Sequence, residues 1–167
     1  MRKVFHFESP RDRYQCDAAV IWCFDNRFEL ACRKFLKYAG VMQPDPIKVA
    51  GGPKSLASPE HAFQTAFVVE QIEKSVRLHN TKRIILFMHS DCGAYGGLAH
   101  FKDDTAVEEA HHVMELVRAT AFLNKTFPAM GVDCYFVDFD GVWEVPMEGT
   151  TKGAADRGTA RRSEEVV

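Results

Sequence analysis

Short apolar runs alternate with longer amphipathic segments along this chain, and this alternation constrains its fold most strongly. Residues 18–23 and 84–88 are continuously apolar, which is typical of strands that are covered on both faces of a sheet. Residues 47–50 form a shorter strand candidate before a glycine pair. Between the strand candidates at 18–23 and 47–50, residues 28–39 carry apolar side chains at helical spacing, and Gly40 stands where a helix C-cap is expected.

Two further helices are indicated by residues that favour helix ends. Ser58 as N-cap and Pro59 at the first helical position predict the start of one helix. Thr105 and Glu108 have the spacing of a capping box and predict the start of another. This last helix should end before Pro128, because proline cannot continue it.

A hairpin completes the pattern, with a strand over residues 134–138, a turn at residues 140–141 and an antiparallel return over residues 142–145. The alternation predicts an α/β fold: a mainly parallel sheet of about four strands with flanking helices and an antiparallel C-terminal edge strand. We expect one domain over residues 1–149. Residues 150–167 lack apolar periodicity, so we expect a polar, flexible tail there.

The composition narrows the choice of partners and compartments. Lys and Arg total 21 against 23 Asp and Glu, and the net charge of −2 argues against nucleic acid, whose phosphates select a basic face. No apolar run approaches the roughly 20 residues of a membrane span, and no signal peptide follows the basic N-terminus. An odd number of cysteines, five, favours a reducing compartment over a disulfide framework. We therefore expect a cytoplasmic protein without nucleic-acid or membrane partners.

Two of the predicted strands end in residues that can bind a metal. The first strand ends at Cys23, which Asp25 and Arg27 follow, and the third ends at His89, which Cys92 follows. Because the carboxyl ends of neighbouring parallel strands meet at one edge of a sheet, these side chains should lie close together. Two thiolates and one imidazole suit zinc, which in catalytic sites has three protein ligands and one open position. The Arg27 guanidinium can donate two hydrogen bonds to the Asp25 carboxylate. This pairing keeps the carboxylate ionised, so it can accept hydrogen bonds but not donate them.

The motif Cys-x-Asp-x-Arg at the end of one strand, followed by His-x-x-Cys-Gly at the end of a later one, resembles the β-class carbonic anhydrases. The resemblance covers the chain from about Gln15 to Val145, including the closing hairpin. It implies that Cys23, His89 and Cys92 hold one zinc ion (Zn²⁺) per chain. It also implies that Asp25 and Arg27 form a catalytic dyad, and that the chain forms a homodimer or a dimer-based oligomer.

The resemblance further implies reversible hydration of carbon dioxide to bicarbonate and a proton, by zinc-bound hydroxide. Zinc lowers the pKa of its bound water from about 16 towards about 7. Two thiolates cancel the charge of the metal, so we expect an activity that rises toward alkaline pH. Asp25 either accepts the proton of the zinc-bound hydroxide in a hydrogen bond, or closes the site as a fourth ligand that Arg27 releases.

The chain departs from the usual pattern of that family at two places. Met88 stands where a glycine usually precedes the metal-binding histidine, and the loop after the second strand has Gly51 and Gly52 where an Arg-Asn-Ala type of sequence is usual. These two glycines and Gly93 are candidate pocket residues, and Gln15 is a candidate for the glutamine often found upstream of the first cysteine. The altered loop keeps hydrolysis of carbonyl sulfide or carbon disulfide open as an alternative. A non-catalytic zinc-binding module is a second alternative.

The remaining cysteines and a histidine-rich helix have structural interpretations. Cys16, Cys32 and Cys134 have no sequence neighbour at ligand spacing, so we expect them to pack in the core. Residues 108–111 and 109–112 each read E-x-x-H, the spacing found in di-iron helical bundles. That site needs carboxylates from two further helices, which the chain does not offer, so we interpret this segment as a solvent-exposed helix face.

Overall fold

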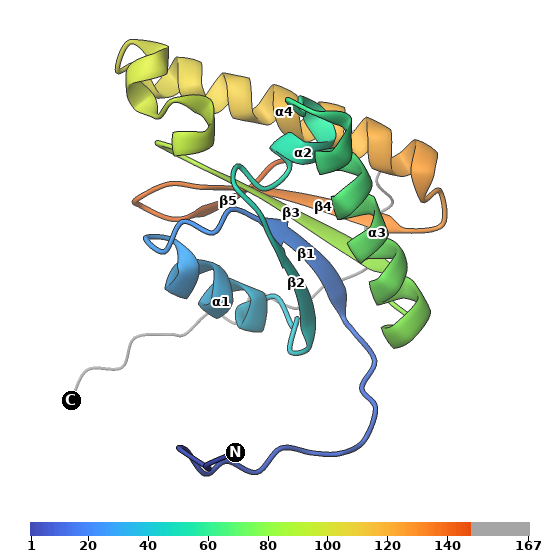
Figure 1. Ribbon diagram of the computed structural model, residues 1–167. Helices are drawn as coiled ribbons and strands as arrows, with labels where there is room; N and C mark the ends of the chain where they lie inside the picture. The colour runs from blue at the N-terminus through green and yellow to red at the C-terminus, as the bar shows by residue number, and fades with distance from the viewer. Residues whose placement is uncertain (148–167) are drawn as a thin grey trace, which may run out of the picture.

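A five-stranded sheet forms the centre of the computed structural model, which describes residues 1–147 (Figure 1). The tail expected over residues 150–167 lies outside the described residues. The strand order is β2-β1-β3-β4-β5, and only β5 runs antiparallel to its neighbour. This confirms the predicted α/β fold with an antiparallel edge strand. The strands are β1 (Ala18–Trp22), β2 (Pro44–Lys48), β3 (Arg83–His89), β4 (Gly131–Val137) and β5 (Val142–Glu144).

The strands that are most apolar in the sequence are the ones that are buried in the structure. Every residue of β1 is buried, and β3 is buried from Ile84 onward, because helices cover both faces of these central strands. The edge strand β2 is less apolar and begins three residues before the predicted position. It contains Pro44 and Pro46, which an edge strand tolerates because one side of it needs no N–H donors.

Helices lie on both faces of the sheet (Figure 1). Buried side chains of α1 pack with alternate residues of β1 and β3 on one face, and those of α3 and α4 pack on the opposite face. The strand side chains divide between the two faces because successive residues of a strand point in opposite directions. The helices are α1 (Glu29–Tyr38), α2 (Lys54–Ala57), α3 (Ala62–His79) and α4 (Thr105–Thr126), with 3₁₀ turns η1 (Gly93–Tyr95) and η2 (Leu98–Phe101).

The start of α3 differs from the prediction. Ser58 is the C-cap of the short helix α2, and Pro59 lies in the connection that follows. The N-cap of α3 is His61, whose backbone N–H donates to the side-chain oxygen of Gln64 at 3.0 Å. The predicted start at Ser58 was wrong: Gln64, inside the helix, accepts from the N–H groups of Glu60 and His61, and no serine caps its first turn.

The start of α4 was placed at the correct residue, but with the wrong cap. Asp104 is the N-cap, and its carboxylate accepts hydrogen bonds from the N–H groups of Ala106 and Val107 at 3.0 and 3.1 Å. The expected capping box between Thr105 and Glu108 is therefore not formed. The Glu108 side chain instead points into the protein and is only 1% exposed.

The core accounts for three of the cysteines. Cys16, Cys32 and Cys134 are all buried, as predicted, and among residues 1–147 all five cysteines are free thiols. No helix within residues 1–147 combines the length and the apolar character that crossing a membrane would require.

Candidate functional site

Three potential metal ligands meet at the carboxyl edge of the sheet. Cys23 follows β1, His89 ends β3, and Cys92 lies in the loop after β3. Their two sulfur atoms and an imidazole nitrogen all lie within 4.8 Å of one another. The neighbouring strands β1 and β3 pair in parallel, so their ends bring the two loops together, as the sequence predicted.

The histidine of this cluster has one nitrogen that is bound and one that is not. His89 Nδ1 lies 2.8 Å from the backbone oxygen of Ser90. A carbonyl can only accept, so Nδ1 carries the proton and Nε2 is left with its lone pair. Nε2 is buried and has no hydrogen-bond partner among residues 1–147. A buried basic nitrogen without a partner beside two thiols fits a metal ligand, because metal-binding histidines commonly donate their other nitrogen to a carbonyl.

The two thiols of the cluster differ in their acidity. The hydrogen bond from the Cys92 thiol is the main cause that lowers the pKa of the Cys23 thiol, and the nearby His89 imidazole and the backbone N–H of Gly51 act in the same direction. The neighbouring Cys23 sulfur raises the pKa of Cys92. The cluster therefore holds one thiolate readily and a second only when another positive charge is present. Such a donor set favours the binding of a cation.

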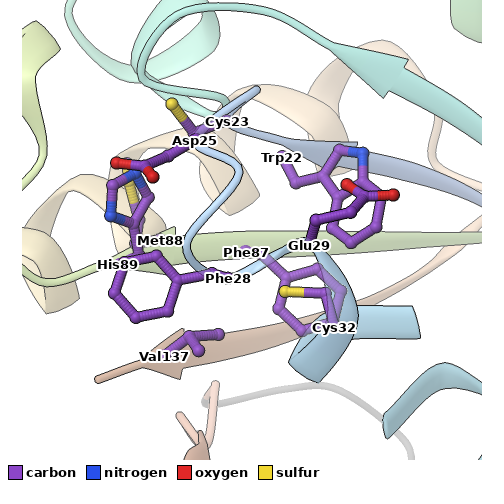
Figure 2. A pocket seen from close by; sticks show the side chains of 10 residues that line it. All are labelled: Trp22, Cys23, Asp25, Phe28, Glu29, Cys32, Phe87, Met88, His89 and Val137. Atoms are coloured by element: carbon purple, nitrogen blue, oxygen red, sulfur yellow. The ribbon is translucent and has the colours of Figure 1, made fainter. Parts of the chain in front are cut away.

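Asp25 and Arg27 form the ion pair that the sequence predicted. Arg27 Nη2 donates to Asp25 Oδ2 at 2.7 Å, Nε donates at 3.1 Å, and the backbone N–H of Arg27 donates to Oδ1 at 3.0 Å. The hydrogen bonds from the Arg27 side chain are the main cause that lowers the pKa of Asp25 to about 2. Asp25 is therefore a carboxylate at neutral pH. It lines a pocket together with Cys23 and His89 (Figure 2).

Asp91 joins this ion pair from the other loop. Arg27 Nη1 donates to Asp91 Oδ2 at 2.8 Å, and Nη2 donates to the backbone oxygen of Asp91 at 2.9 Å. The other carboxylate oxygen accepts from the N–H of Leu98 at 2.9 Å. Gly97 has a φ of +68°, and a Cβ there would lie 2.9 Å from Asp91 Oδ1. Arg27 thus bridges two loops that are 64 residues apart. No local sequence pattern predicts a contact between residues so far apart.

The glycine pair after β2 presses against the end of β1. Gly51 and Gly52 have φ angles of +70° and +53°, in the region that favours glycine. A Cβ at Gly52 would lie 2.9 Å from the carbonyl carbon of Trp22 and 3.0 Å from the nitrogen of Cys23. Close backbone approach therefore requires this glycine and brings both glycines beside the cluster.

The pocket beside the cluster has a largely apolar wall. It is lined by aromatic and aliphatic side chains from β1, β3, β4 and the N-cap of α1, with Asp25 and Glu29 as its carboxylates (Figure 2). The ring of Phe28 lies 4.9 Å from the His89 ring, centroid to centroid. The apolar members of the wall are Trp22, Phe28, Phe87, Met88 and Val137.

Two other candidate residues have contrasting positions. Gly93 directly follows Cys92 and begins η1, so it lies next to the cluster along the chain. Gln15 is exposed and precedes β1, whereas Cys23 follows β1. Gln15 thus lies at the opposite end of that strand, and the chain does not bring it to the cluster.

The helix face interpreted as solvent-exposed is partly buried instead. Glu108, His112 and Glu115 of α4 are each at most 1% exposed. Tyr95 donates to Glu115 at 2.8 Å and Arg118 donates to it at 2.7 Å, while Ser58 also contacts it. Burial lowers the pKa of His112 to about 4, so its imidazole is neutral at pH 7.

The sequence carried a signal for this burial that the E-x-x-H interpretation missed. Residues 108, 112 and 115 follow the helical spacing of the apolar stripe that continues through Leu116, Ala119 and Leu123. Because these three polar residues lie on the same helix face as the apolar stripe, the spacing predicts that they are buried with it. Glu108 also reaches the loop after β3, where Oε1 accepts the N–H of Asp91 at 2.8 Å.

A family model described as putative carbonic anhydrase matches residues 14–147 of this chain. The chain belongs to this family. Two relatives are uncharacterized proteins of Rickettsia. The protein of Rickettsia conorii is 26% identical over 133 residues, covering 78% of this chain and 72% of the relative. The protein of Rickettsia bellii is 28% identical over 133 residues, covering 78% of this chain and 81% of the relative.

Two solved structures share the fold. A tetrameric β-carbonic anhydrase of the filamentous ascomycete Sordaria macrospora aligns with a TM-score of 0.55 at 16% identity, covering 80% of this chain and 82% of that chain. The β-carbonic anhydrase CafA of Aspergillus fumigatus aligns with a TM-score of 0.50 at 14% identity, covering 78% and 76%. At these identities the likeness establishes the β-carbonic anhydrase type of fold.

Proposed function

We propose that this protein is a zinc-dependent carbonic anhydrase, a lyase that reversibly hydrates carbon dioxide to bicarbonate and a proton. The observation that carries the proposal is the buried, unpartnered Nε2 of His89, beside the sulfur atoms of Cys23 and Cys92. The carboxylate Asp25, held by Arg27, lines the same pocket. Membership of a family of putative carbonic anhydrases supports the same conclusion.

Cys23, His89 and Cys92 would hold the zinc ion, one per chain. Two sulfur atoms and a neutral imidazole are a ligand set that zinc prefers. When bound, zinc supplies a water acidified enough to give hydroxide near neutral pH. The thiolates weaken this effect by cancelling charge, so we expect the activity to rise toward alkaline pH.

The other residues orient and receive the reactants. Asp25 is a carboxylate that can only accept a hydrogen bond, so it orients an O–H donor beside the cluster and leaves the oxygen lone pair free for carbon dioxide. Arg27 fixes both the charge and the position of Asp25. The apolar wall around Phe28 would disfavour a charged product such as bicarbonate and so support its release. Gly51 and Gly52 would shape the other side of the pocket.

A second candidate reaction uses the same site. The glycine pair in place of an Arg-Asn-Ala type of loop opens the possibility of a different small substrate, because this loop lies directly against the end of β1. Carbonyl sulfide and carbon disulfide are also linear and uncharged. Release of hydrogen sulfide from carbonyl sulfide, at a rate above that of carbon dioxide hydration, would favour this hydrolase. A chain that binds zinc but has no hydration activity at any pH would instead be a zinc-binding module.

We also propose that the chain acts as a cytoplasmic homodimer or dimer-based oligomer, with residues 1–149 as a single domain. The β-carbonic anhydrases of Sordaria macrospora that share this fold are tetrameric, which supports an oligomer here. Light scattering of the purified protein tests this, and a monomer at micromolar concentration would contradict it.

Stopped-flow measurement of carbon dioxide hydration, with zinc content determined on the same samples, tests the main proposal. Cys92→Ser should lose zinc and activity together, because it removes a ligand. Asp25→Ala should keep one zinc per chain and lose most of the rate. Cys134→Ala is the matched control, since it removes a buried thiol outside the cluster. Full zinc content and activity in Cys92→Ser would show that the site is wrongly assigned.

A further inference from the structure

Glu108 carries a carboxyl group that is buried inside the protein. Its side chain is 1% exposed and extends from the first turn of α4. Burying such a group is costly unless hydrogen bonds replace those it makes to water. His112 lies one turn along the helix, with Nε2 at 3.7 Å from Glu108 Oε1. Burial keeps that imidazole neutral at pH 7, so it offers no ion pair there.

The hydrogen bonds to Glu108 come from the loop that carries two of the candidate metal ligands. The backbone N–H of Asp91 donates to Glu108 Oε1 at 2.8 Å, and the N–H of Cys92 also interacts with the carboxyl group. Asp91 stands between His89 and Cys92, and its φ of +53° lies in the left-handed region. A residue other than glycine persists there when its surroundings hold it. Glu108 therefore holds strained backbone between two ligands.

Asp91 also connects this backbone to the ion pair on the opposite side of the loop. Its carboxylate and its backbone oxygen accept from Arg27 at 2.8 and 2.9 Å, and Arg27 in turn holds Asp25. A change in the Asp91 peptide would thus displace Cys92 and loosen Arg27 at the same time.

We propose that Glu108 is a positioning residue for the metal-binding loop, acting through the backbone of Asp91 and Cys92. The inference rests on the proposed metal site at Cys23, His89 and Cys92, and it does not depend on which substrate the site converts. Outer partners that orient metal ligands typically contribute about 10-fold to 100-fold in metal affinity. Loss of the Glu108 acceptor should therefore weaken metal binding by about that factor.

Glu108→Leu tests this, because it removes the acceptor and places an apolar side chain of comparable size in the buried position. The measurement is Co²⁺ affinity by chelator competition, together with the thiolate-to-Co²⁺ absorption band. We expect Glu108→Leu to lose about 10-fold or more in affinity and to change the band. Glu108→Gln keeps an acceptor oxygen for the Asp91 N–H, so its affinity should remain within about 3-fold of the wild type.

Thr120→Val is the matched control on the same helix. Thr120 is buried, and its hydroxyl lies 3.2 Å from the sulfur of Cys134, outside the cluster. This variant loses a buried hydrogen bond without touching the metal-binding loop. It should therefore keep the Co²⁺ affinity and spectrum of the wild type.

Two outcomes would overturn the inference in distinguishable ways. Wild-type affinity and spectrum in folded Glu108→Leu would refute the positioning role and leave the metal site intact. A wild-type protein that binds neither Co²⁺ nor Zn²⁺ would refute the metal site and the inference with it. If Glu108→Leu does not fold, Glu108→Asp decides, since its shorter side chain withdraws the carboxylate from the Asp91 N–H. Unchanged affinity in Glu108→Asp would refute the role.

Discussion

The guanidinium of Arg27 donates to the carboxylate of Asp25 through Nη2 at 2.7 Å and through Nε at 3.1 Å. Its Nη1 reaches Asp91, on the loop after β3, at 2.8 Å. One planar group therefore sets the charge of Asp25 and its position relative to the loop that carries the candidate ligand Cys92. A lysine cannot reproduce this, because its ammonium presents donors from a single point.

Arg27→Leu and Arg27→Lys should both lower kcat/KM for carbon dioxide hydration by about 10-fold to 100-fold, the scale of losing an outer residue that orients a metal site. Zinc content should stay near one per chain, since no ligand is removed. Without the Arg27 hydrogen bonds, the pKa of Asp25 should rise from about 2 toward its usual value near 4. Stopped-flow kinetics and ¹³C NMR titration of the Asp25 carboxyl measure these effects. Arg33→Leu, at an exposed arginine of α1, is the control, and a wild-type rate in Arg27→Leu would contradict the assigned role.

Gly52→Ala should displace the end of β1 and weaken metal binding. The new Cβ would lie 2.9 Å from the carbonyl carbon of Trp22 and 3.0 Å from the nitrogen of Cys23, so backbone rather than a flexible side chain must move. We expect a loss of about 1–3 kcal/mol in the free energy of unfolding, and a lower affinity for zinc. Urea denaturation and chelator competition measure the two effects.

Gly40→Ala separates steric clash from backbone strain. Gly40 also has a positive φ, +78°, but a Cβ there would meet no atom within 4 Å. This variant should lose stability through backbone strain alone, about 1 kcal/mol, and keep the zinc affinity of the wild type. Equal zinc affinities in Gly52→Ala and Gly40→Ala would show that the glycine pair does not support Cys23.

In metal-free protein, iodoacetamide at pH 6 should alkylate Cys23 first. All five cysteines lie within residues 1–147, and Cys23 alone among them is not buried. The hydrogen bond from Cys92 and the nearby His89 imidazole favour its thiolate, the reactive form. Burial instead raises the pKa of Cys32 and of Cys134 to about 12. Mass spectrometry of digested protein identifies the labelled residue. Added zinc should protect Cys23, and equal labelling with and without zinc would contradict its role as a ligand.

The parts of the fold that follow from local pattern could be predicted from the sequence. The buried strands β1 and β3 are visible as apolar runs, and the rule that parallel strands end at one edge was enough to bring Cys23, His89 and Cys92 together. The pair Asp25 and Arg27 was also predictable, because the two residues lie close in sequence.

What could not be predicted depends on contacts between distant segments. The bridge from Arg27 to Asp91 joins residues 64 positions apart, and the hydrogen-bond partner of the buried Glu108 carboxyl group is a backbone N–H of another loop. The first turn of α3 shows the same limit on a smaller scale. Gln64, inside the helix, makes the side-chain contact at its start, and the serine upstream of it does not cap the helix.

The buried imidazole of His112 should make the protein less stable in acid. Burial lowers the pKa of His112 to about 4 in the folded state, against about 6.5 in the unfolded chain. Between these values the unfolded state binds a proton that the folded state does not, so the free energy of unfolding falls as the pH falls from about 6.5 to about 4. The full effect of this one group is about 3 kcal/mol. Urea denaturation of metal-free protein across this pH range measures it.

His112→Leu should flatten the acid slope, because leucine does not titrate and fills a similar volume. Neither ring nitrogen of His112 has a hydrogen-bond partner among residues 1–147, so the substitution costs no hydrogen bond there, and at pH 4–5 the variant should equal or exceed the wild type in stability. Leu123→Ala is the control on the same buried face of α4. It should lower the free energy of unfolding by about 2–5 kcal/mol at every pH, without changing the slope. An unchanged slope in His112→Leu would show that other groups govern the acid response.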